Sequence, residues 1–261
     1  MLDEARFSGI ARLYGTDAVG LFSQAHIMVV GIGGVGSWTV EALARSGMGR
    51  ITMVDLDEIC LSNVNRQLHA MDGQIGKLKT SAMRERCLAI SPTMHVEECQ
   101  TFFAESNAAD LLALQPHVVV DAIDAVKQKC LLLAMCRDRA IPVITCGAAG
   151  GRTDPTKITV ADLAHSCHDA LLLQTRKILR SSYGFPKSNG DKKPAKKFRI
   201  SAIFSSETPT DPRCAASADS SDEKSLRLNC ATGYGTSSMV TGAFGLIAAQ
   251  QALAALLHGK T

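Results

Sequence analysis

An apolar run that ends in regularly spaced glycines constrains this chain more than any other feature. Residues 27–31 read IMVVG, and Gly31, Gly33 and Gly36 follow the order G-I-G-G-V-G just before a helical pattern that begins at Ser37. In a strand–turn–helix unit the first glycine permits a tight turn, the second lets backbone N–H groups approach phosphate, and the third permits close helix packing. The N-terminus of the helix also favours an anion. The segment therefore predicts a nucleotide-binding unit, with NAD, FAD, S-adenosylmethionine and ATP all open.

Alternating strand and helix patterns extend this prediction to a whole sheet. Strands are predicted at 27–31, 51–55, 95–97, 118–123 and 143–146, and helices at 37–45, 78–90 and 127–139. Such alternation is typical of parallel strands joined by right-handed crossovers. We therefore expect an α/β fold with a doubly wound, mostly parallel sheet of Rossmann-like type.

The pattern changes after about residue 164. A helix at 170–181 is followed by two polar stretches rich in turn formers, at about 185–198 and 205–226, which we expect to be mobile loops. A short strand at 198–204 lies between them. We expect residues 1–163 to form an ATP-binding core and 164–261 a looped, substrate-facing lobe, together making one integrated domain.

Composition excludes several classes of protein. Hydrophobic residues make up 46% and charged residues 20% of the chain, which describes an ordinary soluble domain, and the net charge of +3 is too small to imply a partner. Nine cysteines, none in a C-x-x-C pair, disfavour a four-cysteine zinc site and a secreted disulfide framework. We therefore expect a cytoplasmic protein.

One stretch is long and apolar enough to raise the question of a membrane. Residues 239–257 carry no charge and approach the length that spans a bilayer. They also contain Gln250, Gln251 and two glycines, and they lack an aromatic belt. A helix that is apolar all round is equally typical of a buried core helix, which we favour over membrane association.

A second polar cluster narrows the choice of nucleotide. Asp55 lies 19 residues past Gly36, at the end of the second predicted strand, where a carboxylate binds ribose hydroxyls. Arg66 follows in the next loop, and Lys79 opens the next predicted helix. Two cations that converge on a triphosphate would neutralise charge as pyrophosphate leaves. This pattern favours an ATP-consuming enzyme over a redox enzyme.

Two more carboxylates follow the fourth predicted strand. Asp121 and Asp124 lie in the run VVVDAID, at the carboxyl edge where open α/β sheets bind ligands. A carboxylate there could hold Mg²⁺ on the phosphates or position the acceptor. Taken singly, Arg66 and Lys79 read as surface charges and Asp121 as a helix cap; their joint placement favours a nucleotide site.

At this point the chain resembles the ubiquitin-activating-enzyme-like superfamily, which includes the molybdopterin and thiamine-biosynthesis adenylyltransferases. Within it the chain is most similar to the tRNA threonylcarbamoyladenosine dehydratases. The likeness spans nearly the whole chain, and the segments that carry it are RFSGIARLYG (6–15), VGIGGVGSW (30–38), NRQLHA (65–70), DAID (121–124), TCGAAGGRTDPTKI (145–158), NCATGYG (229–235) and TGAFGLIAAQQAL (241–253).

The resemblance implies an ATP-dependent ring closure on tRNA. The carboxylate of the threonylcarbamoyl group, on the adenosine next to the anticodon, would be activated as an acyl-adenylate. An internal nitrogen would then displace AMP, with net loss of water. It also implies a homodimer and leaves a sulfur-relay protein open as a partner.

Residue roles follow by motif from the resemblance. Asp55 would bind ribose, Arg66 and Lys79 the triphosphate, and Asp124 the Mg²⁺–ATP. The wider cofactor-binding set would comprise Gly31, Gly33, Gly34, Gly36, Asp55, Asp57, Asn63, Gln67 and Asp121.

Two departures bear on the alternative, which is an adenylyltransferase that activates the C-terminus of a ubiquitin-like sulfur carrier. Such relatives have an N-terminal arginine that reaches ATP in the partner subunit, where this chain has Gly9, so that Arg6 or Arg12 would have to substitute. They also commonly carry paired C-x-x-C motifs. Both differences disfavour the sulfur-carrier activity. A nucleotide-sensing scaffold and a nicotinamide dehydrogenase explain less of the pattern.

Two further features are candidates for catalysis and RNA binding. Cys230 could act as a nucleophile, although ring closure requires no covalent enzyme intermediate. The stretch 176–199 is strongly basic, and flanking aromatic side chains at Tyr183, Phe185 and Phe198 suit base stacking. The predicted RNA contacts are Lys187, Lys192, Lys193, Lys196, Lys197 and Arg199.

Overall fold

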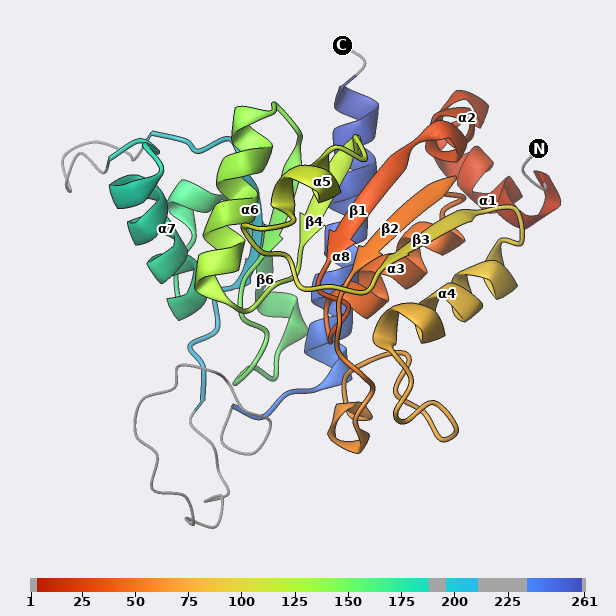
Figure 1. The fold of residues 1–261 in the computed structure, drawn as a ribbon, viewed down its shortest axis with the longest axis horizontal. Coiled ribbons are helices and arrows are strands. Elements are labelled where there is room, and N and C mark those ends of the chain that lie inside the picture. The colour runs from red at the N-terminus through yellow and green to blue at the C-terminus, as the bar shows by residue number, and fades with distance from the viewer. Residues whose placement is uncertain (1–3, 188–195, 211–233, 260–261) are drawn as a thin grey trace.

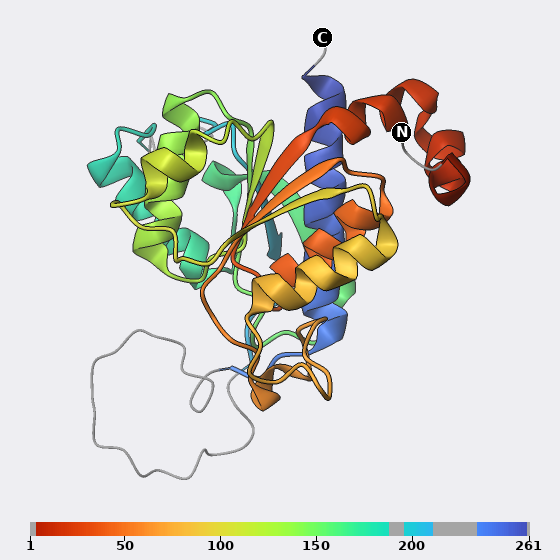
Figure 2. The same ribbon diagram turned by 45° about the vertical axis from the view of Figure 1, so that its right-hand side comes forward.

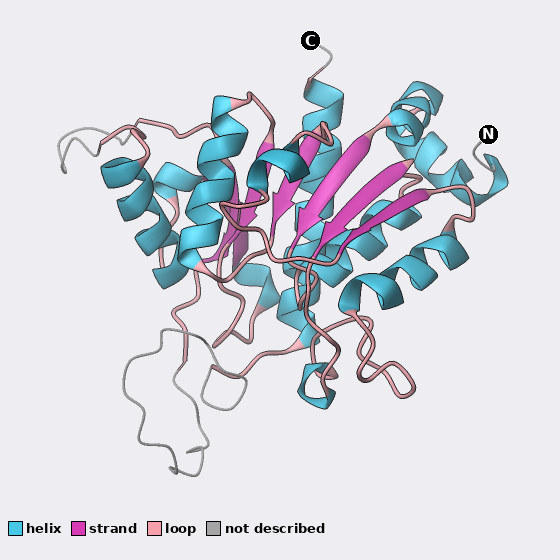
Figure 3. Cartoon of the chain, viewed as in Figure 1, coloured by secondary structure: helices cyan, strands magenta, loops and turns pink. Residues whose placement is uncertain are grey.

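A seven-stranded sheet forms the centre of the protein. The computed structural model describes residues 4–187, 196–210 and 234–259. The strand order is β3-β2-β1-β4-β5-β7-β6, and every neighbouring pair is parallel except β6 and β7 (Figures 1 and 3). The strands are β1 (His26–Val30), β2 (Arg50–Val54), β3 (His95–Cys99), β4 (Val118–Asp121), β5 (Val143–Cys146), β6 (Ile158–Asp162) and β7 (Ser201–Ser205). The predicted doubly wound, mostly parallel sheet is confirmed.

Helices cover both faces of this sheet. They are α1 (Glu4–Tyr14), α2 (Thr16–Gln24), α3 (Gly36–Arg45), α4 (Lys79–Ile90), α5 (Ala108–Leu112), α6 (Val126–Asp138), α7 (Ala170–Ser182) and α8 (Ser238–His258), with short 3-10 turns η1 (Leu61–Asn63), η2 (Pro155–Lys157) and η3 (Leu163–His165). Figure 2 shows α3, α4 and α8 on one face and α5, α6 and α7 on the other.

Alternation along the strands creates two separate hydrophobic cores. Ile27 and Val29 of β1 belong to the core shared with α3 and α8, whereas Met28 and Val30 belong to the core shared with α5, α6 and α7. A strand covered on both faces therefore reads as the continuous apolar run seen in the sequence. Burial of this kind, at about 25 cal/mol per Å² of apolar surface, is the main term that stabilises the sheet.

The strand order reverses between β1 and β4. β1 pairs with β2 on one side and with β4 on the other. Loops that leave the carboxyl ends of such neighbouring strands run to opposite faces, which opens a crevice for ligands at that edge. The glycine turn, the loop after β2 and the loop after β4 all leave this carboxyl edge, so the fold brings the three predicted clusters to one place.

The last third of the chain contributes to the same sheet. β7 lies between β5 and β6, and α8 packs against β4, β5 and β7. Among the described residues, α8 is the one helix long and apolar enough to cross a membrane, with a mean hydropathy of 1.6, and 56% of that window is buried within this fold. Phe244, Ala248 and Ala252 are fully buried on its inner face.

Several elements were not predicted. α1, α2 and α5 are absent from the expected pattern, as is β6, which pairs with β7 alone at the end of the sheet and is half-exposed. Its short mixed sequence ITVAD has no distinctive periodicity, so its strand conformation depends on pairing with β7. The strand expected at 198–204 lies at Ser201–Ser205. Much of the predicted loops at 185–198 and 205–226 falls outside the described residues.

Candidate nucleotide-binding site

Two of the glycines are required by the backbone itself. Gly31 has φ +89°, and a Cβ there would lie 2.8 Å from the carbonyl oxygen of Ala122 in the loop after β4. A Cβ on Gly36 would lie 1.8 Å from the carbonyl oxygen of Gly31. Any side chain at either position would therefore push apart the turn between β1 and α3.

The middle of the turn is more open. At Gly33 the nearest group to an added Cβ is the Nε2 of Gln67, at 3.9 Å, whereas at Gly34 it is Thr241, at 3.2 Å. Gln67 is buried, and within the described residues its Oε1 receives no hydrogen bond. A buried acceptor without a partner is uncommon in folded proteins, and a bound ligand is one of the ways to satisfy it.

Asp55 is buried at the carboxyl end of β2. Its Oδ2 accepts a hydrogen bond from the N–H of Ile32 at 2.6 Å, and its Oδ1 accepts one from the N–H of Asp57 at 2.8 Å. Burial raises the pKa of the Asp55 carboxyl, against the charge of Lys79 and these two donors, which lower it. The carboxylate thus ties the glycine turn to the loop after β2.

His69 completes this arrangement and was not singled out from the sequence. Its Nε2 lies 2.9 Å from the carbonyl oxygen of Ile32, and because a carbonyl only accepts, Nε2 carries the proton. Burial lowers the pKa of His69 to about 4, so the ring is neutral. The backbone N–H of Ile32 is therefore bound by Asp55, and its backbone carbonyl is bound by His69. The position of His69 in NRQLHA, two residues after Gln67, was the only available signal.

Lys79 and Asp57 form an ion pair at the start of α4. The Nζ of Lys79 lies 2.6 Å from Oδ2 of Asp57, and the backbone N–H of Lys79 donates to the Asp57 carbonyl at 3.0 Å. The lysine side chain is 8% exposed, whereas that of Asp57 is 51% exposed. The cation is thus held in place at the edge of the site by a carboxylate that faces solvent.

Arg66 lies just after η1, in a loop held by side-chain contacts. Its Nη1 donates to the carbonyl of Ser62 at 2.7 Å and to Oδ1 of Asn65 at 3.0 Å. Asn63 is buried, and its Oδ1 accepts from the N–H of Cys60 at 3.0 Å. In this structure Asn63 therefore stabilises the turn that carries Arg66; a direct contact of Asn63 with nucleotide stays a prediction.

The two aspartates after β4 differ sharply in environment. Asp121 is fully buried, with its Oδ2 2.6 Å from Nζ of Lys129 and 2.6 Å from Oγ1 of Thr145, which donate to it. Its Oδ1 accepts from the N–H of Ile123 at 3.0 Å. Asp124 is exposed at the carboxyl edge. Of the two, Asp124 is open to solvent, whereas Asp121 stabilises the loop from inside; contact of Asp124 with a ligand stays a prediction.

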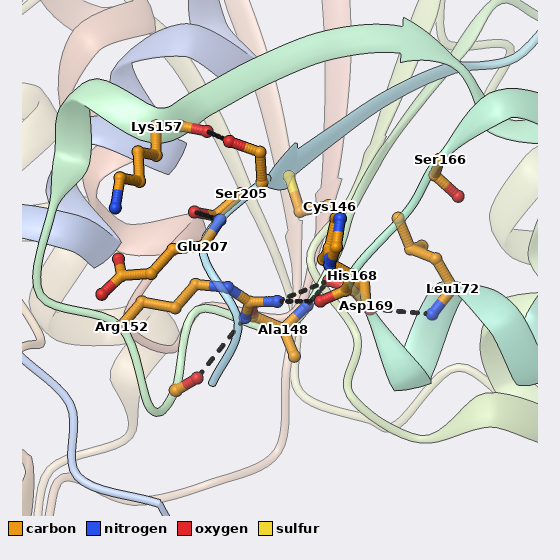
Figure 4. A network of polar contacts seen from close by, with 12 residues as sticks. Cys146, Ala148, Arg152, Lys157, Ser166, His168, Asp169, Leu172, Ser205 and Glu207 are labelled. Carbon is orange, nitrogen blue, oxygen red and sulfur yellow. Dashed lines mark hydrogen bonds and ion pairs between the residues drawn. The ribbon is translucent and has the colours of Figure 1, made fainter. Parts of the chain in front are cut away.

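A buried arginine organises the loop after β5, as Figure 4 shows. Nη2 of Arg152 donates to the His168 carbonyl at 2.9 Å and lies 3.5 Å from Oδ2 of Asp169, and Nη1 donates to the Ala148 carbonyl. Asp169 also accepts from the N–H of Ala148 at 2.9 Å and caps α7. Burial lowers the pKa of the Arg152 guanidinium, whereas Asp169 and Glu207 raise it.

This loop meets two segments that arrive from the last third of the chain. The N–H of Gly151 donates to the Gly235 carbonyl, and the N–H of Thr210 donates to the Gly151 carbonyl, each at 2.8 Å. The Glu207 carboxylate accepts from the backbone N–H groups of Thr153 and Asp154. These contacts hold the segment GGRTDPTK (150–157), called the Gly151 wall below, in place at the carboxyl edge of the sheet.

The basic stretch lies elsewhere. Lys196, Lys197 and Arg199 precede β7, and Lys187 follows α7, so they lie at the amino edge of the sheet, opposite the glycine turn (Figure 1). Lys192, Lys193 and Cys230 lie outside the described residues. The four predicted RNA contacts that lie within the described residues are thus at the opposite edge of the sheet from the predicted ATP residues.

Two of the three aromatic side chains expected to stack on RNA are in the core, whereas Tyr183 is half-buried. Phe185 is 3% and Phe198 is 5% exposed, and their rings lie 5.0 Å apart. Arg137 lies over Phe185 at 4.2 Å and Arg180 over Phe198 at 5.1 Å. The expectation that these two rings stack on bases is wrong, because their faces are already covered by the two guanidinium groups and by one another.

Comparison with known proteins gives one consistent result. A sequence model described as the ThiF family matches residues 8–261. The chain is 45% identical over 258 residues to the tRNA threonylcarbamoyladenosine dehydratase of Haemophilus influenzae, covering 99% of this chain and 95% of that protein. It is 29% identical over 140 residues to the molybdopterin-synthase adenylyltransferase of Escherichia coli, covering 54% of this chain and 55% of that one.

Solved structures agree with the sequence comparison. Crystal structures of the E. coli tRNA N6-threonylcarbamoyladenosine dehydratase in complex with ATP and with AMP match with TM-scores of 0.86 and 0.87. In both, sequence identity is 40%, and the match covers 98% of this chain and 96% of that chain.

Proposed function

The chain belongs to the ThiF family, and from this premise we propose that it is an ATP-dependent enzyme that cyclises threonylcarbamoyladenosine in tRNA with net loss of water. The observation that carries the proposal is the likeness, over 99% of the chain, to a relative that bears this activity in its name. The nucleotide is ATP, in keeping with the ATP and AMP complexes of the E. coli enzyme.

The residues at the carboxyl edge suit the binding of ATP. The turn around Gly33 presents backbone N–H groups to the phosphates at the start of α3. Each oxygen of Asp55 accepts a single backbone N–H, so that lone pairs remain for the ribose hydroxyls. Arg66 and Lys79 supply positive charge on the side of the triphosphate.

The reaction follows from leaving-group chemistry. A carboxylate oxygen of the threonylcarbamoyl group attacks the α-phosphorus of ATP, and the bond to the β-phosphate breaks, releasing pyrophosphate. A nitrogen of the same group then attacks the acyl carbon, loses its proton and expels AMP. Hydroxide is a poor leaving group and AMP a good one. Because the nucleophile is intramolecular, the protein contributes positioning and charge stabilisation.

The donor set also fits Mg²⁺. Asp124 is an exposed carboxylate at the edge where the phosphates are expected, and Mg²⁺ is commonly held by one or two carboxylates together with substrate phosphates. We propose Asp124 as its protein ligand. The ion would supply neutralisation of phosphate charge.

The segments that meet at Gly151 are proposed as the tRNA-facing part of the site. The buried Arg152 and the Glu207 contacts hold this wall beside the glycine turn. A flexible target strand needs a fixed surface against which the modified adenosine can be placed. We propose that the segment 150–157 and the parts of the last third that contact it at Glu207, Thr210 and Gly235 form the substrate-facing part of a single domain.

A homodimer in the cytoplasm is proposed for the assembly. Large apolar side chains are exposed beside the site at Leu61 (70%) and Val64 (52%), and on α1 at Leu13 (72%). Exposed apolar groups of this kind are typical of interfaces. Arg12 is exposed on α1 and is the better candidate for a cation given to a second copy, because Arg6 donates to the Ile90 carbonyl.

To test the proposal, the protein is incubated with ATP and with tRNA that carries threonylcarbamoyladenosine. The masses of the nucleosides are then measured by mass spectrometry. ATP-dependent loss of one water, with AMP release, supports it. Lys79→Gln should lower the rate about 10²–10³-fold, in the range seen when one charge-stabilising group is removed. Lys77→Gln is the matched control, since Lys77 is exposed and pairs with Glu85. AMP formation with a ubiquitin-like carrier in place of tRNA would instead establish the sulfur-carrier activity.

A further inference from the structure

The backbone carbonyl of Arg66 receives hydrogen bonds from two side chains on different helices. Nε1 of Trp38, in the first turns of α3, donates to it at 3.1 Å. Oγ1 of Thr241, in the first turn of α8, lies 3.2 Å from it and 3.1 Å from the Ser237 carbonyl, so the single hydroxyl proton is shared between these two acceptors. A carbonyl oxygen has two lone pairs, so the Arg66 carbonyl can accept from both side chains. The residue proposed to bind the triphosphate is thus tied at its backbone to both helices.

The two helices are themselves in backbone contact. A Cβ on Gly245 of α8 would lie 2.5 Å from the Val35 carbonyl oxygen and 2.6 Å from Cβ of Trp38. A Cβ on Gly242 would lie 3.5 Å from the Trp38 indole. Glycine at these positions therefore lets α8 lie directly against α3 (Figure 2), which fixes the two donors relative to each other.

A third contact anchors the neighbouring residue. Nδ2 of Asn65 donates to the Thr236 carbonyl at 2.8 Å, just before α8 begins. Thr241 also lies against the glycine turn, since a Cβ on Gly34 would be 3.2 Å from its Cγ2. The start of α8 therefore contacts both the phosphate-binding turn and the loop that carries Arg66.

We propose that Trp38 and Thr241 are positioning residues that set the place of Arg66 in the ATP site, and that the start of α8 is part of the activating machinery. This inference rests on the proposed function, because it requires Arg66 to act on ATP. Arg66 follows a single 3-10 turn and has no long helix or strand of its own to fix it. A displacement of about 1 Å at a reacting group costs as much as about 10²-fold in rate.

Two conservative variants remove the donors one at a time. Trp38→Phe keeps an aromatic ring beside Gly242, and Thr241→Val keeps the branched shape beside Gly34. Each should lower kcat for ATP-dependent cyclisation about 10-fold or more and change KM for ATP less, because the interaction of Arg66 is strongest as charge develops.

Thr39→Val is the matched control. Oγ1 of Thr39 lies 3.1 Å from the Val35 carbonyl and 3.2 Å from the Gly245 carbonyl, so its single proton is shared between these two acceptors and links α3 to α8 without touching Arg66. The control should lose thermal stability to a similar degree while its kcat stays at the wild-type value. A fall in kcat for Thr39→Val equal to that of Thr241→Val would overturn the inference, because helix packing alone would then explain both.

A double-mutant cycle separates this inference from the proposed function. In an Arg66→Ala background, Trp38→Phe and Thr241→Val should cause no further loss of kcat, since they act through Arg66. Full additional losses there, or wild-type kcat in both single variants, would overturn the positioning role and leave the proposed function intact. Wild-type turnover by Arg66→Ala would instead remove Arg66 from the proposed mechanism.

Discussion

The carboxylate of Asp121 lies 2.6 Å from the ammonium of Lys129, and both side chains are fully buried beneath the carboxyl edge of the sheet. Lys129 also donates to the carbonyl of Cys146 at 3.0 Å, and the N–H of Ile123 donates to Asp121. The pair therefore links the ends of β4 and β5 and orders the loop that presents Asp124.

Removal of one member of this pair should destabilise the protein strongly. Lys129→Met leaves a buried carboxylate without its counter-charge, and breaking a buried pair in this way costs about 3–5 kcal/mol. Urea unfolding of the single variant measures the loss. The double variant Lys129→Met with Asp121→Asn should recover part of it, because no charge is then left buried. A single variant within about 1 kcal/mol of wild type would contradict this account.

The positions of Asp121 and Asp124 could be predicted from the sequence, but not which of the two is buried. The run VVVDAID predicted two carboxylates at the right edge of the sheet, which is where they lie. Which of them faces inward depends on Lys129, eight residues further on, whose burial no local pattern indicates. A lysine in a helical segment is ordinarily read as exposed.

The contacts of several aromatic and histidine side chains also could not be predicted from the sequence. Phe185 and Phe198 flank a basic stretch and so suggested RNA stacking, but tertiary contacts with Arg137 and Arg180 place them in the core. His69 fixes the glycine turn through a carbonyl 37 residues away in the chain. The strand–helix alternation was predictable because it depends on local apolar periodicity, whereas these contacts depend on the assembled fold.

Two buried histidines should make stability fall in mild acid. Burial lowers the pKa of His26 and of His69 from 6.5 to about 4. Below pH 6.5 the unfolded chain takes up these protons and the folded protein does not. The stabilisation is thus fully present above pH 6.5 and is lost as the pH falls towards 4.

The expected size of this loss is about 2 kcal/mol per histidine between pH 7 and pH 5, if the protein stays folded. Urea unfolding at several pH values measures it. His26→Gln and His69→Gln should each flatten the pH dependence, whatever their effect at pH 7. If the free energy of unfolding changed equally with pH in wild type and in both histidine variants, other groups would be responsible for the loss of stability in acid.

The glycine turn should reject even one methyl group at Gly36. Alanine there would place Cβ 1.8 Å from the Gly31 carbonyl oxygen, so the turn must open and the N–H groups move away from the phosphates. We expect loss of ATP binding and a lower melting temperature. Gly73→Ala is the control. Gly73 has φ +79° with nothing within 4 Å of an added Cβ, so only backbone strain of about 1 kcal/mol follows. Comparable ATP affinity in the two variants would disprove the steric requirement.

The basic patch should affect tRNA affinity without affecting chemistry. Lys187, Lys196, Lys197 and Arg199 lie at the amino edge of the sheet, a five-residue strand of about 17 Å away from the ATP edge. They could therefore contact only parts of tRNA remote from the reacting adenosine. Replacing all four with Gln should weaken binding of full-length tRNA and reduce the slope of log affinity against log salt, by about 0.7–0.9 for each phosphate that the protein no longer neutralises.

Turnover of a short anticodon stem-loop that carries the modified adenosine separates a remote contact from a role in the site. If the patch binds only the distal part of tRNA, the quadruple variant and wild type should process the stem-loop at equal kcat and KM. Lys157→Gln replaces a cation at the opposite, carboxyl edge and is the variant with which the quadruple variant is compared. Lys157 is exposed in η2 and is the last residue of the Gly151 wall. A defect of the quadruple variant on the stem-loop would instead show that the patch contacts the stem-loop itself. Unchanged affinity for full-length tRNA would mean that these cations are a solvated face of the protein.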